Sequence, residues 1–130
     1  MDAITRISRL QSPTGSVRMV LDTDTANEID DQFALVWALL SPERLSLEAI
    51  YAAPFYADWH PGSTSPEDGM EKSYIEILKV LSLMDMRVTP PVSKGSTDFL
   101  PGHGQPATDS DAVQDLIERA RQPGLLYAVC

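Results

Sequence analysis

The chain has 130 residues, of which 43% are hydrophobic and 22% are charged. This balance fits one folded domain, or a piece of a larger one, and excludes a disordered chain. The formal net charge of −9 argues against a protein that grips nucleic acid by its phosphates, because such proteins need a basic surface. No apolar run is long enough to span a bilayer, so we expect no membrane partner either.

Cysteine usage and the amino terminus bear on the compartment. Cys130 is the only cysteine, so no intramolecular disulfide forms and no Cys/His cluster has zinc spacing. Residues 1–16 lack the apolar core of a signal peptide and are expected to form a flexible amino-terminal arm. We therefore expect a cytoplasmic protein whose folded part spans residues 17–130.

The first half of the chain alternates between strand and helix patterns. Val17–Leu21 is a short apolar run and reads as a buried strand. Ile29–Leu40 reads as an amphipathic helix that Asn27 or Asp30 caps. Its expected apolar stripe, with Trp37 in the core, is Ile29, Phe33, Val36, Trp37 and Leu40.

Three further segments follow in the middle of the chain. Leu45–Ala53 predicts a second strand, after which residues 54–68 are irregular. Glu67–Met84 predicts a second helix, followed by a short strand near Arg87-Val88 and a stretch rich in glycine and proline. The stripe expected on this helix is Met70, Tyr74, Ile77, Leu78 and Leu81.

The last part of the chain completes the alternation. Asp109–Arg121 predicts a third helix that Asp109 or Ser110 caps, with an apolar stripe of Val113, Leu116, Ile117 and Ala120. Leu125–Cys130 predicts a buried strand, and strands joined by helices predict an α/β protein with a parallel sheet and helices on both faces. An apolar strand at the terminus favours a shortened form of a longer protein over a sheet that ends there beside a partner chain.

The chemically distinctive segment is an acidic loop after the first strand. Asp22, Asp24, Glu28, Asp30 and Asp31 fall within ten residues, at a strand end and a helix start. Asp22 and Asp24 would project to the same side of an extended chain, and Asp30 and Asp31 diverge by about 100° around a helix. Such crowded carboxylates favour a bound calcium or magnesium ion, although capping of the helix and a solvated turn explain the pattern equally well.

The wider pattern resembles the nucleoside hydrolases, the inosine-uridine-preferring N-ribohydrolases. A strand is followed by Asp22-Thr23-Asp24, a short loop, and Asp30-Asp31 opening a helix. Similarity continues in order through residues 30–35, 52–53, 69–74, 91–96, 109–110 and 126–129. The resemblance implies that residues 17–130 are the amino-terminal part of a Rossmann-like nucleoside hydrolase domain, from a divergent branch of the family.

This resemblance also implies a reaction and a set of roles. It implies calcium-dependent hydrolysis of the N-glycosidic bond of ribonucleosides, in nucleoside salvage, with a ribose-containing small molecule as ligand. Asp24 would be a calcium ligand and the general base, and Asp31 a second calcium ligand. Asp30 would accept a hydrogen bond from a ribose hydroxyl, and Asp22 would support the loop from behind.

The chain departs from the family in three places. Its loop between Asp24 and Asp30 is longer than the family's Pro-Gly loop, and Asn27 there supplies a polar contact or, as we favour, a helix cap. Pro54-Phe55-Tyr56-Ala57 stands where the family has a ribose-contacting asparagine. The family's other ligands lie in a later half, so this chain alone is expected to bind calcium weakly and to hydrolyse little.

Other interpretations of the same residues compete with this one. Phe55, Tyr56 and Trp59 either stack on a nucleobase or, as we favour, pack their own loop. In a haloacid dehalogenase-like phosphatase, Asp22 would be the nucleophile and Asp24 the general acid, with magnesium as cofactor. A third interpretation is a non-catalytic binding or assembly module, a homo-oligomer that pairs through its terminal strand.

Overall fold

A computed structural model describes residues 2–59, 61–86, 88–100, 102, 106 and 108–130. The first four elements are α1 (Ala3–Arg9), β1 (Val17–Thr23), α2 (Ile29–Leu39) and β2 (Leu45–Ala52). They are followed by α3 (Pro66–Leu83), β3 (Val92–Lys94), α4 (Asp111–Ala120) and β4 (Leu126–Val129). Apart from α1 and β3, each element lies within a few residues of its predicted position.

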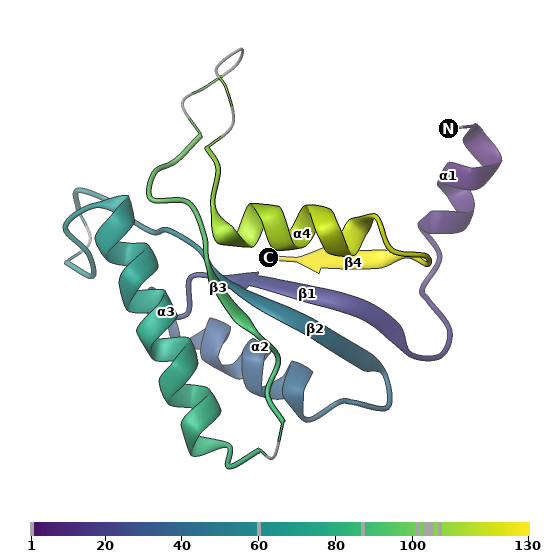
Figure 1. Cartoon of the computed structure of the whole chain (residues 1–130), viewed down its shortest axis with the longest axis horizontal. Coiled ribbons are helices and arrows are strands. Elements are labelled where there is room, and N and C mark those ends of the chain that lie inside the picture. Colours follow the sequence, from purple (N-terminus) through teal and green to yellow (C-terminus); the bar gives the residue numbers. More distant parts are fainter. Residues whose placement is uncertain (1, 60, 87, 101, 103–105, 107) are drawn as a thin grey trace.

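The four strands form one parallel sheet in the order β3-β2-β1-β4. In the centre, Leu21 of β1 pairs with Ile50 of β2 on one side and with Val129 of β4 on the other. The helices α2 and α3 cover one face of the sheet and α4 covers the other, as Figure 1 shows. The structure thus confirms an α/β fold with a parallel sheet and helices on both faces.

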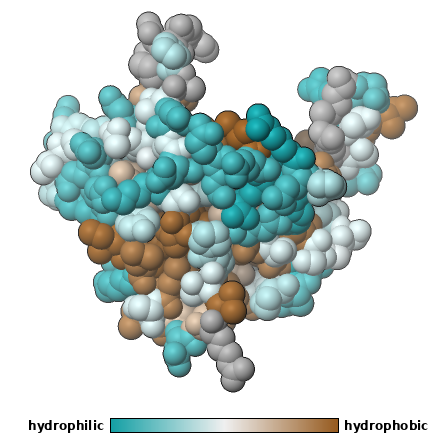
Figure 2. All heavy atoms as spheres, viewed as in Figure 1, coloured by the Kyte–Doolittle hydropathy of each residue, from teal (hydrophilic) through white to brown (hydrophobic). Residues whose placement is uncertain are grey.

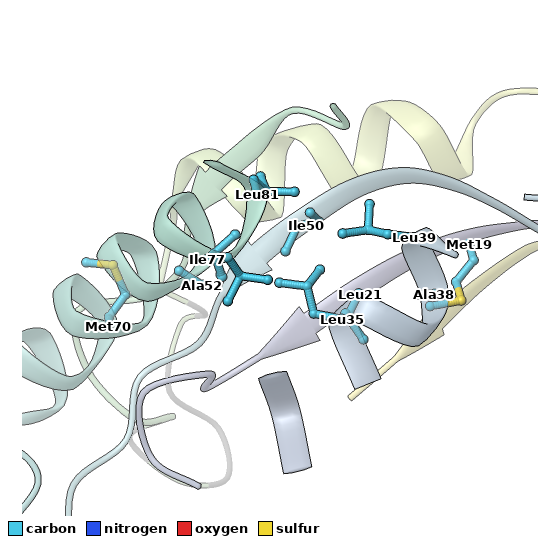
Figure 3. Close-up of a cluster of buried hydrophobic side chains, with 11 residues drawn as sticks. Met19, Leu21, Leu35, Ala38, Leu39, Ile50, Ala52, Met70, Ile77 and Leu81 are labelled. Atoms are coloured by element: carbon cyan, nitrogen blue, oxygen red, sulfur yellow. The ribbon is translucent and has the colours of Figure 1, made fainter. Parts of the chain in front are cut away.

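The larger core lies between the sheet and the pair α2 and α3. Figure 3 shows Leu35 of α2 and Ile77 of α3 pointing toward Leu21 and Ile50 of the strands. Burying such side chains contributes about 1.5–3 kcal/mol each before conformational entropy is counted. The full set of buried residues is Met19, Leu21, Leu35, Ala38, Leu39, Ile50, Ala52, Met70, Ile77, Val80 and Leu81.

The predicted inward stripe of α2 was wrong. Trp37 is 77% exposed, and Ile29, Phe33 and Leu40 are also mostly exposed, whereas only Val36 of the predicted stripe packs against the core. The buried side chains of α2 are Leu35, Ala38 and Leu39. Because α2 carries apolar residues on both sides, helical periodicity alone did not identify the side that packs on the sheet.

The stripes of α3 and α4 were predicted in part. Met70, Ile77 and Leu81 of α3 are buried, but Leu78 is exposed. In α4 the buried residue is Ala112, with Leu116 packed beside it, while Ile117 and Ala120 are exposed. The Ser110 side chain accepts a hydrogen bond from the amide of Val113 at 3.2 Å, as predicted for the cap of this helix.

The third strand was predicted too early in the chain. Val88 lies outside the sheet and is 81% exposed, and Arg87 is outside the described residues. The strand β3 instead begins after Pro90-Pro91, and Ile50 of β2 donates its amide hydrogen to the carbonyl of Pro91 at 3.0 Å. A proline has no amide hydrogen for a sheet ladder but keeps its carbonyl, which explains this start.

The amino-terminal segment contains a helix that the sequence did not predict. Asp2 caps α1 by accepting a hydrogen bond from the amide of Thr5 at 2.9 Å. Figure 1 shows α1 standing apart from the sheet, so it adds nothing to either core. Within the described ranges, no helix is both long and apolar enough to cross a membrane.

Candidate functional site

The acidic loop lies where the strand order of the sheet reverses. The crossover from β1 to its neighbour β2 runs through α2 on one face of the sheet, whereas the crossover from β3 to β4, the other neighbour of β1, runs through α4 on the opposite face. The loop from Asp22 to Asp31 occupies the carboxyl end of β1, beside the carboxyl end of β4. In open α/β sheets this switch point is the usual place for a ligand.

Asp24 and Asp31 are brought together at this position. Asp24 begins a turn, in which the amide of Asn27 donates to the Asp24 carbonyl at 2.7 Å. The pKa of Asp31 is raised, first because the carboxylate is partly buried and further because the negative charge of Asp24 lies close to it. A positive charge near two carboxylates that repel each other in this way would stabilise both.

Two buried threonines support the acidic pair, and neither was identified from the sequence. Thr23 Oγ1 donates to Asp31 Oδ1 at 2.5 Å and lies 3.1 Å from Thr25 Oγ1. Because a hydroxyl has only one hydrogen, Thr25 donates to Thr23 when Thr23 donates to Asp31. The threonines interleaved with the aspartates were a usable signal, because a hydroxyl near a carboxylate can donate a hydrogen bond to it.

Asn27 orients Asp24 and does not cap α2. Its Nδ2 donates to Asp24 Oδ2 at 3.0 Å, which supports the polar-contact interpretation over the capping one. The residue at the cap position is Glu28, whose side chain makes no capping hydrogen bond. Asp30 is exposed in the first turn of α2, so it presents its carboxylate to solvent beside the Asp24–Asp31 pair.

Asp22 lies on the other side of the loop from the acidic pair. It lines a cavity of about 390 Å³ next to Tyr51, Ala112 and Val129, on the face of the sheet that α4 covers. Asp22 is exposed to solvent, but partial loss of hydration beside the cavity raises its pKa, and the charge of Asp24 adds to this effect. Asp22 and Asp24 line different cavities because β1 ends at Thr23, so the strand alternation that predicted a shared side stops there.

An aromatic cavity adjoins Asp24. Its volume is about 260 Å³, and Tyr56, Trp59 and Phe99 line it together with Asp24 and Asn27. Trp59 is 85% exposed and Tyr56 is partly exposed, so these two rings face solvent at the cavity. The packing interpretation therefore holds for Phe55, which is buried, and not for Trp59.

The loop that carries these aromatic residues is held against the start of α3. A Cβ added to Gly69 would lie 2.0 Å from the Phe55 carbonyl oxygen, so no larger residue fits there without a shift of the backbone. Ser63 Oγ donates to the same oxygen at 2.8 Å. These two contacts fix the loop at the carboxyl end of β2, and the sequence analysis assigned this role to neither Gly69 nor Ser63.

The acidic pair supplies only part of a metal site. Across the described ranges, no three His, Cys, Asp or Glu side chains come close enough to hold an ion together. An ion held by Asp24 and Asp31 would take its remaining ligands from water or other oxygen atoms, and calcium needs six to eight. The oxygen-only chemistry of the pair fits calcium or magnesium better than zinc.

No family model, curated protein or solved structure matches the chain. Function is therefore inferred from the chemistry of the site, because an α/β fold by itself hosts many activities.

Proposed function

We propose that the chain carries the calcium- and ribose-binding part of a nucleoside hydrolase, which cleaves the N-glycosidic bond of ribonucleosides. The observation that supports this most is the pairing of Asp24 with Asp31 at the carboxyl end of β1. The aromatic cavity beside Asp24 is a second support, because its rings suit a flat heterocyclic base. A cytoplasmic location is part of the same proposal.

Asp24 and Asp31 would hold the cation on this proposal, and Thr23 would orient Asp31. When bound, calcium supplies a positive charge that makes nearby water easier to deprotonate and that attracts the vicinal hydroxyls of ribose. It would also relieve the repulsion that raises the pKa of Asp31. The pair fits this role through its oxygen ligands and its position.

Asp24 would also act as the general base. Asn27 holds Asp24 Oδ2 and so orients the carboxylate that would take a proton from water. The water oxygen would bond to the anomeric carbon as the N-glycosidic bond breaks. The electron pair of that bond would leave with the nucleobase. Asp30, which is exposed, would accept a hydrogen bond from a ribose hydroxyl, and Asp22 would support the loop from behind.

The chain by itself is expected to bind calcium weakly and to hydrolyse little. Asp24 and Asp31 provide too few oxygens for a complete calcium shell, and no third acidic or histidine ligand accompanies them among the residues that the structure describes. Calcium affinity decreases when a site has fewer charged ligands or is less rigid, and the weakest calcium sites in proteins have dissociation constants of about 10⁻⁴–10⁻³ M.

Two alternatives differ in what they require of the structure. A haloacid dehalogenase-like phosphatase needs both aspartates of the Asp22-Thr23-Asp24 motif at one substrate, and their separate cavities do not favour it. A non-catalytic binding or assembly module is favoured by the large apolar side chains exposed on α2.

Calcium titration by calorimetry tests the proposal. We expect the wild-type chain to bind calcium with a dissociation constant of about 10⁻⁴–10⁻³ M and the double variant Asp24→Asn/Asp31→Asn to lose binding. The variant Glu43→Gln/Glu118→Gln, which removes the same charge from exposed positions, is the matched control. Binding that survives in the first variant, or that the control also loses, would contradict a specific site.

A second measurement separates the enzyme classes. With saturating calcium, release of reducing sugar from inosine at a rate that Asp24→Asn abolishes would support hydrolysis of nucleosides. Release of phosphate from p-nitrophenyl phosphate with magnesium, abolished by Asp22→Asn, would overturn the proposal in favour of a phosphatase. A chain that binds no calcium and acts on neither substrate would leave the binding module as the better description.

A further inference from the structure

An uncharged apolar surface runs along the side of α2 that faces away from the sheet. Its members, here called the α2 surface, are Ile29, Phe33, Trp37 and Leu40, together with Leu83 at the end of α3. Each of these side chains is 65% to 77% exposed. Figure 3 shows Leu35 and Leu39 of α2 pointing toward the strands. The α2 surface lies on the opposite side of the helix and does not contribute to the buried core cluster.

A groove adjoins the α2 surface between α2 and α3. Its volume is about 260 Å³, and apolar side chains such as Phe33, Val36, Val80 and Leu83 line it. The one polar lining residue is Gln32, whose Nε2 is bound to Glu76 Oε1 at 3.0 Å. The groove is therefore suited to a large apolar side chain, since the amide nitrogen of Gln32 already donates to Glu76.

The exposed area is larger than a compact monomer of this mass has. The chain exposes 8772 Å², whereas a folded monomer of 14.3 kDa exposes about 6,800 Å². The projecting helix α1 in Figure 1 accounts for part of the difference. The five members of the α2 surface present on the order of 700 Å², which is close to the roughly 800 Å² that each partner buries in a stable interface.

We propose that a second copy of this chain covers the α2 surface, with Trp37 of each copy seated in the groove between α2 and α3 of the other. Counted around α2 from Phe33, Trp37 lies about 40° to one side and the groove residue Val36 about 60° to the other. The same helix thus carries Trp37 and one wall of the groove on opposite sides of Phe33. A two-fold axis that places Trp37 of one copy in the groove of the other also places the second Trp37 in the first groove, so the contact forms twice.

Charge favours this surface over the rest of the molecule as the place where two copies meet. With a formal net charge of −9, two copies repel each other over most of their surfaces. None of the five side chains is charged, and the exposed carboxylates of Glu28 and Asp30 lie at one end of α2, where they would remain at the solvated rim. An apolar centre with a charged rim is the usual composition of an interface between identical chains.

Sedimentation velocity over a concentration series tests this interface. The wild-type chain is expected to sediment as a dimer that dissociates on dilution, and Trp37→Glu should weaken the dimer about 30-fold or more. The matched control is Ile75→Glu, which places the same charge on another exposed apolar position of α3, outside the groove, and should leave the dimer intact. Circular dichroism would verify that both variants keep the wild-type helix content.

Tryptophan fluorescence provides an independent readout. In a Trp59→Phe background, emission from Trp37 should shift to shorter wavelength as the concentration rises through the dimer range, because the ring leaves water. A wild-type chain that is monomeric throughout the series would overturn the proposal. So would a dimer that Val129→Glu, on the edge strand β4, disrupts while Trp37→Glu does not, since pairing would then run through the sheet edge.

Discussion

The two faces of the sheet are stabilised by different interactions. On the α2 and α3 face, all eleven clustered buried residues are apolar. On the α4 face, the buried cluster among the described residues is smaller and consists of Val20, Ala49, Tyr51 and Ala112, and ion pairs add to the contact with α4. Figure 2 shows hydrophilic surface over α4, with hydrophobic atoms gathered below it toward α3.

The ionic contacts on the α4 face form one connected network. Glu48 of β2 binds Arg18 of β1 at 2.6 Å and lies 3.5 Å from Arg119 of α4. Arg119 in turn binds Asp115 at 2.6 Å, and the hydroxyl of Tyr51 donates to Asp115 at 2.7 Å. This face is therefore expected to respond to pH and salt, whereas the apolar face should respond mainly to the loss of side-chain volume.

The largest expected effect comes from a cavity in the apolar face. Ile77→Ala should lower the free energy of unfolding by about 3 kcal/mol, because Ile77 is fully buried and its neighbours cannot close the gap completely. Leu116→Ala, at a half-buried position on the α4 face, should cost about 1 kcal/mol. Urea unfolding would measure both, and equal losses would contradict the difference between the faces.

The next effect comes from breaking the ionic network. Arg119→Met should lower the free energy of unfolding by about 1–2 kcal/mol, since it removes the partly buried ion pair with Asp115 and the longer contact with Glu48. Lys79→Met is the control, because Lys79 pairs with Glu76 at the surface and should contribute almost nothing. An equal loss of unfolding free energy in Lys79→Met would indicate that the network stabilises the fold no more than a surface ion pair does.

The same network gives the sign of the pH dependence. Arg119 lowers the pKa of Asp115, and Arg18 lowers the pKa of Glu48. Carboxylates with lowered folded-state pKa values stabilise the fold above their ordinary pKa, and this stability is lost as the pH falls through the lowered values. Thermal unfolding between pH 6 and pH 3 should therefore show a shallower loss in Arg119→Met than in the wild-type chain.

A smaller effect distinguishes two buried serines. Ser73 Oγ has no hydrogen-bond partner within the described part of the chain, whereas Ser63 Oγ donates to the Phe55 carbonyl at 2.8 Å. Ser73→Ala should be neutral or stabilise the fold by less than about 1 kcal/mol, and Ser63→Ala should destabilise it by about 1 kcal/mol. Differential scanning calorimetry on both variants would check this ranking, which the reverse order would contradict.

The smallest effect concerns the acidic pair itself. Because the folded state raises the pKa of Asp31, its ionisation destabilises the fold, and stability decreases as the pH rises through the raised value. Asp31→Asn should therefore raise stability at pH 7 by less than about 0.5 kcal/mol and have no effect at pH 3. A variant that is less stable than the wild type at pH 7 would show that the Thr23 hydrogen bond outweighs the repulsion.

Much of the fold was predictable because it depends on local patterns. Strand and helix periodicities, the Ser110 cap and the alternation of elements were sufficient for the parallel sheet and its helices. The sequence also located the acidic loop at a strand end, which in a parallel sheet is where ligands bind. Each of these features is decided by residues a few positions apart in the chain.

Only the tertiary structure decided what depends on distant partners. The side of α2 that packs on the sheet and the cavity that joins Asp24 to Trp59 both require segments far apart in sequence to meet. α2 is apolar on both sides, so its own sequence is compatible with either side being buried. The position of the sheet and of α3 selects Leu35 and leaves Trp37 exposed, because only one side of a helix can pack against a sheet.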